Sequence, residues 1–414
     1  MKAIVIGSGG REHAIAWKLS QSQLIDKIYC APGNGGTALE NKCENIKIYD
    51  FKKLLNFSKD NKIDFVVVGP EAPLVDGITD IFKANGIKIF GPSKQAAALE
   101  GSKAFAKDFM KKYGVKTAAY EVFHEPLSAL NYLKSCSYPI VIKADGLAAG
   151  KGVSICQSPK EAADCIESFM VDDIFKGAGR RIIIEEFLEG VEASILAVTD
   201  GTTIIPLLSA KDHKTIYENN EGPNTGGMGA VTPNPFCTKE VLESFRTEIM
   251  EPTLKGIGKE DMDYVGVIFF GIMITKKGVY LLEYNVRMGD PETQAVLPLM
   301  ESDFAELIIN ALDKNLCNYN LRWKNKYSCC VVAASGGYPN KYKIGFEVNG
   351  ISNDGDKVFI AGARLEGDKL LTSGGRVLAV TSLDESLEKA RIRAYNGIDK
   401  ISFSDSYYRK DIGL

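Results

Sequence analysis

The feature that most constrains the fold is a β-hairpin predicted over residues 265–287, whose second half alternates polar and apolar side chains. A strand has a side-chain period of two. We therefore expect Glu283, Asn285 and Arg287 on one face, with Leu281 before them on the same face. A carboxylate and an amide oxygen side by side are hard ligands suited to Mg²⁺, and a guanidinium can hold a carboxylate bidentately. The polar outer face of an edge strand is the simpler explanation. Because the strand runs directly into a polar turn, a binding site is favoured.

Length, charge and cysteine content limit the number of domains, the partners and the kind of metal that this chain can have. The chain has 414 residues, too many for one ordinary core, so two or three domains are expected. Its net charge of −3 and its dispersed Lys and Arg argue against a nucleic-acid partner. Three His and nine Cys without a C-x-x-C pair argue against zinc or a disulfide framework, so any metal should be a hard cation on oxygen ligands. Without a membrane-spanning stretch or a signal peptide, a cytoplasmic protein with no membrane partner is expected.

The first hundred residues have the pattern of a parallel sheet. Short strands are predicted at 2–6, 27–30, 65–68 and 87–90, and helices at 11–20 and 75–85. Three of the strands end in Gly or Pro-Gly, which suits a Rossmann-like domain whose site lies at the strand ends.

The turn after the first strand is rich in glycine and suits an anion facing a helix N-terminus. A dinucleotide site is one interpretation. It is opposed by Glu12 in place of a small residue, and by a second strand that ends at Cys30–Gly33 without an acidic residue for a ribose. A purely structural turn is a second interpretation. We favour binding of a phosphate monoester or similar group with Arg11 in reach, at the sheet edge where the loop Gly7–Glu12 converges with Asn34–Gly36 and Gly69–Pro73.

A second glycine-rich loop spans Lys143–Gly152. A P-loop needs Ser or Thr after its Gly-Lys pair and then a helix, whereas here Lys151 is followed by Gly152 and a predicted strand. The loop is therefore predicted to be a flexible lid over phosphates. Lys143 ends an apolar strand, where a buried ammonium needs an anionic partner such as phosphate.

An acidic segment follows at Glu185–Glu192. Such clusters are usually exposed faces. An extended segment containing Phe187 and Leu188 can nevertheless offer backbone groups to a purine edge, and Glu192 can accept hydrogen bonds from ribose hydroxyls. From about residue 327, short predicted strands and one helix indicate a small β-rich domain.

With these motifs the chain resembles the glycinamide ribonucleotide synthetase (phosphoribosylamine–glycine ligase) family of the ATP-grasp superfamily. The most specific match is Arg287–Gln294, supported in order along the chain by Gly9–Ala14, Gly69–Leu74, Lys143–Gly152 and Gly222–Ala230. Two positions depart from the family pattern. Met288 stands where Leu or Phe is usual, a tolerable change in volume, and Lys211 stands where Gln is usual. The second departure concerns a polar contact near the substrates and not the reaction class.

The resemblance implies a mixed α/β (α+β) architecture with an ATP-grasp fold. It divides the chain into a substrate-phosphate-binding α/β domain at 1–101, an ATP-grasp domain at 102–326 with a lid at about 121–190, and a β-rich C-terminal domain at 327–414. The implied reaction is ATP-dependent ligation of glycine to 5-phosphoribosylamine through glycyl phosphate, which gives glycinamide ribonucleotide, ADP and phosphate in de novo purine (IMP) biosynthesis. The expected partners are these small molecules, and the expected assembly is a monomer or weak dimer.

The resemblance also assigns residues to these roles. For ATP they are Lys103, Lys143, Gly150, Lys151, Gly152, Glu186, Phe187, Leu188 and Glu192, and for Mg²⁺ or Mn²⁺ they are Glu283 and Asn285. For the other substrates they are Gly9, Gly10, Arg11, Glu12, Glu71, Asp212, Asn224, Thr225, Gly226 and Arg287. Catalysis is assigned to Arg287, Lys143 and Asp212.

Three alternatives stay open. A different ATP-grasp ligase, such as a carboxylase or another purine-pathway member, is disfavoured by the Arg-x-Gly-Asp-Pro-Glu run and the Gly-Gly-Arg-Glu loop. A dinucleotide-dependent oxidoreductase would be protected against unfolding by NAD and not by Mg-ATP. A non-catalytic nucleotide-binding regulator is disfavoured because the metal pair and both lysines are present.

Overall fold

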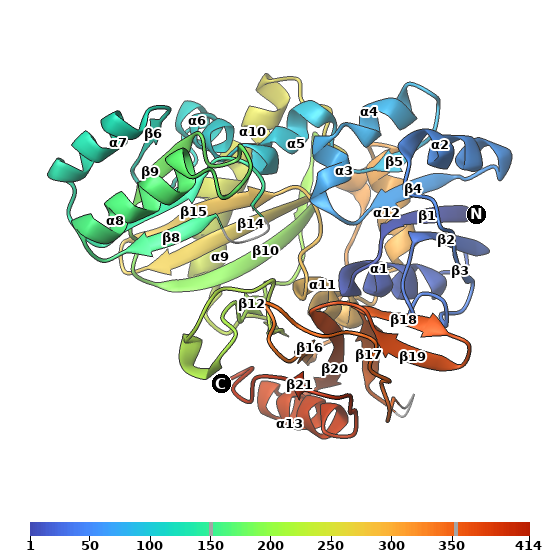
Figure 1. The fold of residues 1–414 in the computed structure, drawn as a ribbon. Helices are drawn as coiled ribbons and strands as arrows, with labels where there is room; N and C mark the ends of the chain where they lie inside the picture. The colour runs from blue at the N-terminus through green and yellow to red at the C-terminus, as the bar shows by residue number, and fades with distance from the viewer. Residues whose placement is uncertain (149–151, 352–354) are drawn as a thin grey trace.

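The computed structural model describes residues 1–148, 152–351 and 355–414. Figure 1 shows a parallel N-terminal sheet on the right, a small lid sheet on the left, a long sheet between them and a further sheet below. Gly150 and Lys151, two residues predicted to bind ATP, lie outside the described residues. Within the described ranges, no helix is long and apolar enough to cross a membrane.

The N-terminal sheet is parallel, in the order β3-β2-β1-β4-β5. Its central strand β1 (Lys2–Gly7) is a continuous apolar run because both of its faces are covered. The other strands are β2 (Lys27–Pro32), β3 (Cys43–Asn45), β4 (Phe65–Val68) and β5 (Ile89–Phe90), and the first helices are α1 (Gly10–Ser20) and α2 (Phe51–Asp60). This confirms the predicted parallel sheet.

One predicted helix is wrong in this region. Residues 75–85 do not form a single helix, because Gly77 has φ +92° and divides the segment into α3 (Glu71–Val75) and α4 (Ile78–Lys83). A positive φ is accessible to glycine at no steric cost, so Gly77 ends one helix and starts the next. The chain continues through α5 (Lys94–Gly101) and α6 (Lys103–Tyr113).

The lid sheet is antiparallel, in the order β6-β9-β7-β8. Its strands are β6 (Tyr120–Phe123), β7 (Ile140–Ala144), β8 (Val153–Cys156) and β9 (Ile182–Glu186). The helices α7 (Pro126–Tyr132) and α8 (Pro159–Ile166) pack on it around a separate small core. This core is separate from the other hydrophobic cores of the described residues.

The long sheet, in the order β11-β10-β14-β15, carries the predicted hairpin. Its strands are β10 (Val191–Thr199), β11 (Ile204–Pro206), β14 (Gly266–Thr275) and β15 (Gly278–Asn285). One face is covered by α6, α9 (Lys239–Phe245) and α10 (Glu251–Lys259), with Phe109, Phe245 and Phe270 in the shared core. The opposite face of β15 is therefore the one left for a ligand.

The fourth sheet mixes distant parts of the chain. Its order is β12-β13-β16-β20-β17, and β21 also pairs with β16. The strands are β12 (Lys211–Asp212), β13 (Gly229–Thr232), β16 (Tyr327–Ser335), β17 (Lys357–Ile360), β20 (Arg376–Asp384) and β21 (Ser406–Tyr407), and β18 (Ala363–Glu366) pairs with β19 (Lys369–Thr372). Because β12 and β13 precede residue 327, the C-terminal sheet is built partly from the segment that carries Asp212 and Gly226.

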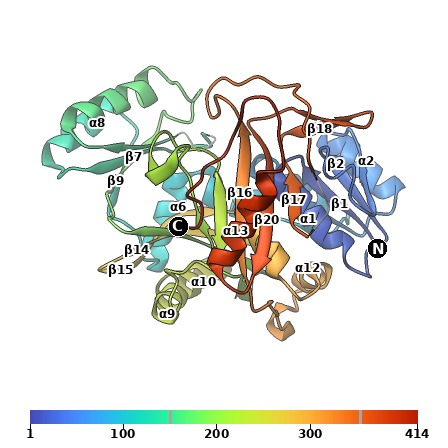
Figure 2. The same ribbon diagram turned by 90° about the horizontal axis from the view of Figure 1, so that it is seen from below.

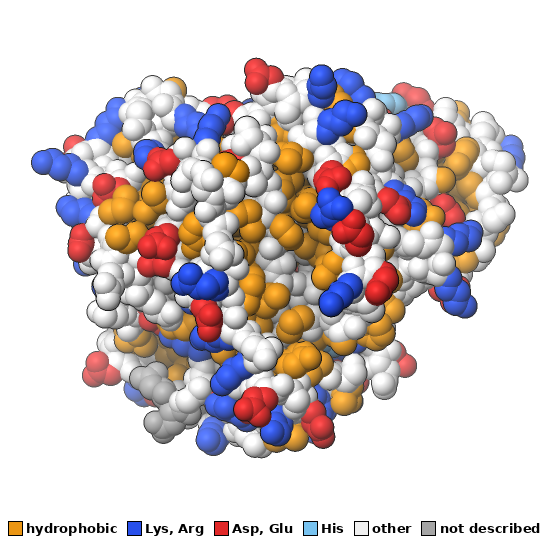
Figure 3. Space-filling view, turned by 180° about the vertical axis from the view of Figure 1, so that it is seen from behind, with side chains coloured by type: hydrophobic (Ala, Val, Ile, Leu, Met, Phe, Trp, Pro, Cys, Tyr) orange, Lys and Arg blue, Asp and Glu red, His pale blue; other side chains and the backbone are white. Residues whose placement is uncertain are grey.

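Helices complete the packing around this sheet. α13 (Leu387–Ile398) lies across β16 and β20, as Figure 2 shows, and α11 (Glu292–Val296) and α12 (Phe304–Leu312) lie between the sheets. On the face opposite to that of Figure 1, basic and acidic side chains are interspersed around a central apolar band (Figure 3). The charge on this face is therefore mixed in sign.

Candidate active site

The open face of β15 carries the predicted acidic and amide pair. Glu283 and Asn285 are half-buried on this face, whereas Tyr284 between them is 2% exposed and points into the core. The expectation for Leu281 is wrong, because Leu281 is 0% exposed and belongs to the core face. The reason is a β-bulge: Gly271 pairs with Glu283 and Ile272 pairs with Leu281, which leaves Leu282 without a partner.

The bulge turns the backbone carbonyl of Leu282 toward the lid. Lys143, on β7, donates to this carbonyl at 3.4 Å, and its Nζ lies 3.0 Å from Glu185 Oε2. Lys107 Nζ lies 3.1 Å from the same carboxylate oxygen. A lysine from α6 and a lysine from the lid thus share one buried acceptor, directly above the β15 strand.

Lys107 and Glu185 were not predicted from the sequence. Both are buried, at 1% and 2% exposure, and burial lowers the pKa of Lys107 to about 8 although Glu185 opposes the shift. The available signal was that Lys107 lies one helical turn after Lys103 and therefore shares its side of α6. Lys103 itself donates to the carbonyl of Gly146 at 3.3 Å, and burial lowers its pKa.

The charges around Glu283 keep it ionised. Burial has the largest effect on its pKa and favours the neutral acid, but Lys214, Lys143 and Lys103 together outweigh burial and lower that pKa. Lys214 forms an ion pair with Glu192. Burial opposes its charge too, yet Glu192 and Glu283 lead the effects that raise its pKa. The site is therefore an ionised carboxylate surrounded by ammonium groups, a setting suited to a metal-bound polyanion.

The guanidinium of Arg287 is engaged with protein groups. Its nitrogens lie 3.1 Å from Glu71 Oε2 and 3.0 Å from Glu100 Oε1. It also donates to Asn285 Oδ1 at 3.1 Å and to the carbonyl of Met288 at 3.2 Å. Arg287 thus orients the amide oxygen of Asn285 and joins the end of β15 to the helices α3 and α5, which carry Glu71 and Glu100. The contact to Glu100 was not predicted from the sequence.

The first glycine loop is held in a similar way. Arg11 donates to Glu12 Oε1 at 2.6 Å and to the carbonyl of Met288 at 3.1 Å, and Glu12 accepts the Gly9 N–H at 2.6 Å. A Cβ at Gly69 would lie 2.1 Å from Glu12 Oε1, so glycine is required for this close approach. Arg11 and Glu12 are buried and bind the turn at 288–290 to the loop. In this structure their side chains therefore contact other protein groups.

Asp212 lies at the end of β12 against the Gly222–Gly229 loop. Its Oδ1 is buried without a hydrogen-bond partner, and a Cβ at Gly227 (φ +108°) would lie 2.7 Å from that oxygen. Burial first and Glu292 second raise the pKa of Asp212 well above its usual range. Thr225 is bound through its N–H to the carbonyl of Lys214 at 2.7 Å, which places the predicted Asn224, Thr225 and Gly226 beside Asp212.

The remaining predicted ATP contacts surround this centre. Glu186 ends β9 and is exposed, Phe187 and Leu188 are half-buried in the connection to β10, and Glu192 near the start of β10 is paired with Lys214. Gly152, directly before β8, accepts the Ala144 N–H at 2.8 Å through its carbonyl. Lys211, the unusual residue, donates to the carbonyl of Leu414 at 3.3 Å and lies over the Phe236 ring, which places it against the chain end and not on the β15 face.

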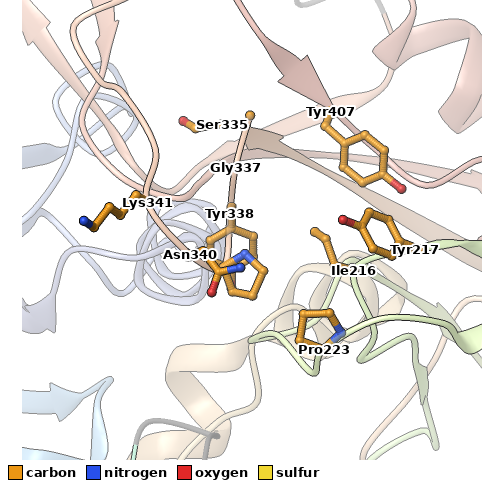
Figure 4. A pocket seen from close by; sticks show the side chains of 11 residues that line it. Ile216, Tyr217, Pro223, Ser335, Gly337, Tyr338, Asn340, Lys341 and Tyr407 are labelled. Carbon is orange, nitrogen blue, oxygen red and sulfur yellow. The ribbon is translucent and has the colours of Figure 1, made fainter.

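A hollow of ≈ 860 Å³ lies beside the Gly226 loop (Figure 4). Tyr338 stands in its wall, and its hydroxyl accepts the Gly226 N–H at 3.0 Å. Tyr217 and Tyr407 meet edge to face on one side, with ring centroids 6.4 Å apart. The hollow was not predicted, because the segments at 216–223, 335–341 and 407 meet only in the folded chain.

The stability of the protein is expected to fall in mild acid because of His213, which is 4% exposed. Its Nδ1 lies 3.3 Å from the carbonyl of Gly229 and its Nε2 accepts the Gly413 N–H at 3.4 Å, an arrangement that only the neutral ring can make. Burial, then Lys211 and Arg409, lower its pKa from 6.5 to about 4. Between these values the unfolded chain binds a proton that the folded chain does not. Lowering the pH through this window therefore costs stability, roughly 3 kcal/mol in all.

Denaturant unfolding between pH 7 and pH 4 tests this expectation. A His213→Gln variant keeps a donor and an acceptor but cannot titrate, so its free energy of unfolding should change less with pH than that of the unaltered chain. Equal pH dependence in the two proteins would contradict the role given to His213.

Comparison with known proteins adds independent information. Family models described as the N, ATP-grasp (A) and C domains of phosphoribosylglycinamide synthetase match residues 1–100, 101–293 and 328–414. The phosphoribosylamine–glycine ligase of Clostridium acetobutylicum is 61% identical over 413 residues, covering 100% of this chain and 99% of that protein.

Solved structures agree with this result. A phosphoribosylamine–glycine ligase from Thermotoga maritima aligns with a TM-score of 0.89 and 34% identity, with 100% of both chains covered. The biotin carboxylase domain of the Hydrogenobacter thermophilus 2-oxoglutarate carboxylase, solved with MgADP, ADP and bicarbonate, aligns with a TM-score of 0.75 over 98% of this chain and 91% of that one. At 16% identity the second likeness concerns the fold alone.

Proposed function

Because the chain belongs to the phosphoribosylglycinamide synthetase family, we propose that the groups between the lid sheet and β15 carry out the ATP-dependent ligation of glycine to 5-phosphoribosylamine. The products are glycinamide ribonucleotide, ADP and phosphate, and the reaction belongs to de novo purine biosynthesis. The observation that carries the proposal is the ionised Glu283, which lies beside Asn285 on one face of β15. Lys107 from α6 and Lys143 from the lid sheet lie above this face.

ATP is proposed to lie between the lid sheet and β15. Lys103 and Lys143 would hold its phosphates, since both ammonium groups approach this space from different elements. The connection after β9, with Glu186, Phe187 and Leu188, would meet the adenine through backbone groups. Glu192 would meet the ribose after exchanging its ion pair with Lys214 for ribose hydroxyls. Gly152, directly before β8, would contact the phosphates.

Glu283 and Asn285 fit a divalent cation, for which we propose Mg²⁺ or Mn²⁺. Their donor atoms are a carboxylate and an amide oxygen, the hard ligands that both ions prefer. In the described residues no group of three or more His, Cys, Asp or Glu side chains is arranged for a metal, so phosphate oxygens and water would complete the coordination. When bound, the cation neutralises charge on the phosphates during transfer.

The chain's own residues would contribute position and charge and no nucleophile. The glycine carboxylate attacks the γ-phosphate to give glycyl phosphate and ADP, and the amine of phosphoribosylamine then displaces phosphate to form the amide. Lys143 would stabilise the transferred phosphoryl group, and Arg287 would act by holding Asn285 and Glu71 in place. A closed lid would keep water from the acyl phosphate.

The other substrates are proposed to bind where the N-terminal loops meet the Gly222–Gly229 loop. Gly9 and Gly10 begin α1 and Glu71 begins α3, each just after a strand of the parallel sheet, and Asn224 to Gly226 come from the segment beside Asp212. The half-buried Asp212, with its raised pKa, would hold or receive a proton near the reacting amine. We propose three units for the chain, at 1–101, 102–326 and 327–414, with the reaction at their junction.

Incubation with Mg-ATP, glycine and phosphoribosylamine is the direct test. Glycinamide ribonucleotide, ADP and phosphate should form in equal amounts, and omission of glycine should stop ADP formation. Replacing glycine by bicarbonate tests the carboxylase alternative, and thermal protection by NAD and not by Mg-ATP would support an oxidoreductase. Folded protein that binds ATP but forms no glycinamide ribonucleotide would refute the proposal.

A further inference from the structure

Arg376, at the start of β20, reaches out of the C-terminal sheet into the neighbouring unit. Its Nη1 donates to the carbonyls of Asp290 at 2.7 Å and Gly227 at 3.3 Å, and also to the carbonyl of Gly226. Its Nη2 lies 3.3 Å from Asp290 Oδ1. The side chain is 19% exposed, so these bonds are partly shielded from solvent.

The two segments that Arg376 joins are those that border Asp212. One is the Gly222–Gly229 loop, whose Gly227 lies against Asp212 Oδ1, and the other is the turn at 288–292. The Pro291 ring also lies against Gly227, since a Cβ there would meet its Cδ at 2.5 Å. The relative position of the loop and the turn therefore sets the space in front of Asp212.

The acceptors of Arg376 are themselves anchored. Asp290 accepts the Arg11 N–H at 3.4 Å through its carboxylate and the Gln294 side-chain amide at 2.8 Å, which connects it to α1 and α11. Gly226 is held from the opposite side by the Tyr338 hydroxyl at 3.0 Å. The C-terminal unit therefore holds Gly226 at two points. Tyr338 accepts its N–H, and Arg376 donates to its carbonyl.

A guanidinium suits this position because it presents two nitrogens in a fixed planar geometry. Nη1 meets the carbonyl oxygens while Nη2 lies near Asp290 Oδ1, and a Lys ammonium, a single point charge, cannot occupy both places. Burial raises the pKa of the Asp290 carboxyl, but Arg376 and Arg11 outweigh burial and lower it, so the acceptor stays charged. Loss of the guanidinium would leave a carboxylate and several carbonyls with fewer donors.

We propose that Arg376 is a positioning residue for the ligation reaction, which holds the Gly222–Gly229 loop against the Asp290 turn and so lets the C-terminal unit set the geometry of the substrate site. The inference rests on the proposed function. It assigns to Arg376 no contact with ATP, because its partners all belong to the loop and the turn.

Steady-state kinetics of Arg376→Met and Arg376→Lys test the proposal. A misplacement on the order of 1 Å costs up to about 10²-fold in rate. We therefore expect Arg376→Met to lower kcat by about 10- to 100-fold, to raise the KM values for glycine and phosphoribosylamine, and to leave the KM for ATP within twofold. Arg376→Lys, which keeps the charge and the N–H donors of one nitrogen but loses the second nitrogen of the fork, should lie between Arg376→Met and the unaltered enzyme.

A structural readout and a matched control separate positioning from general damage. Amide hydrogen exchange should become faster in residues 222–229 of Arg376→Met and stay unchanged in the lid strands. Arg393→Met is the control, because Arg393 lies on α13 of the same unit and its partners among the described residues are nearby, namely Asp356, Asp384 and the Leu383 carbonyl. It should keep normal kinetics and normal exchange in the loop.

Three results would overturn the inference. These are unchanged kcat in Arg376→Met, an equal loss in Arg393→Met, or a rise in the KM for ATP as large as that for glycine. If Arg376→Met does not fold, Arg376→Lys decides, because normal kcat and loop exchange in that variant count against the role. Absence of ligation by the unaltered enzyme would refute the proposed function, whereas an active enzyme indifferent to Arg376 refutes only this inference.

Discussion

Replacement of Glu283 by glutamine is expected to lower kcat by about 10³-fold while the fold is kept. The variant retains one oxygen and the shape of the side chain but loses the negative charge that faces Lys214, Lys143 and Lys103. In the proposed site a divalent cation would then bind weakly beside Asn285, and the phosphates would no longer be held in register with the lysines. Assays at saturating ATP with increasing Mg²⁺ should show partial recovery at high metal concentration.

Circular dichroism and thermal unfolding show whether the variant is folded. Glu347→Gln is the matched control, because Glu347 is an exposed carboxylate paired with Lys369 in the C-terminal unit, and it should leave kcat unchanged. A folded Glu283→Gln enzyme with near-normal turnover would remove Glu283 from the metal site.

Replacement of Arg287 by methionine is expected to lower the free energy of unfolding by about 3–5 kcal/mol, the usual result of removing one partner from a buried ion pair. Glu100 is 8% exposed, and burial already raises its pKa despite Arg287. Without the guanidinium, the carboxyl of Glu100 must be buried unpaired or take up a proton. Activity should fall as well, because Asn285 loses the donor that orients its amide oxygen.

The pH dependence of stability and a second substitution test whether the unpaired Glu100 causes the loss of stability in Arg287→Met. The pKa of Glu100 in the folded variant lies above its unfolded value, so at intermediate pH the folded state binds a proton that the unfolded state does not. The loss in the free energy of unfolding should therefore grow as the pH rises from 5 to 8. Adding Glu100→Gln should recover at least about 1 kcal/mol, since a neutral amide needs no counter-charge. Arg364→Met removes an exposed pair with Glu366 and should change stability by less than about 0.5 kcal/mol. A deficit that is independent of pH and of Glu100 would contradict this account.

Much of the architecture was predictable because local periodicity reports burial. The apolar runs at β1 and β4 are buried on both faces, and their glycine-terminated ends indicated a parallel sheet correctly. The strand β15 alternates as expected from Glu283 onward. Prediction failed at Leu281 and at Gly77, where a bulge and a left-handed residue interrupt the periodicity. Such interruptions depend on the partner strand and the neighbouring helices, which a local pattern does not contain.

The site residues show the same division. Lys143, Glu283 and Asn285 could be proposed as site residues from their place at strand ends beside glycine or polar turns. Lys107, Glu185 and Arg376 could not, because each lies in an ordinary helix or strand and its polar partners are far away in the chain. Their partners are separated from them by tens of residues or more, a relation that composition and spacing do not encode.

The hairpin at 265–287 shows where the two kinds of information meet. By itself the sequence determined that a carboxylate and an amide share one face of a strand, since the alternation of β structure is a property of the backbone. Only the tertiary structure decided that Arg287 is engaged with Glu71 and Glu100, and that Lys107 and Lys143 converge on Glu185 above that face. The physical reason is that charges are paired by distance in space, and folding brings together groups that the chain keeps apart.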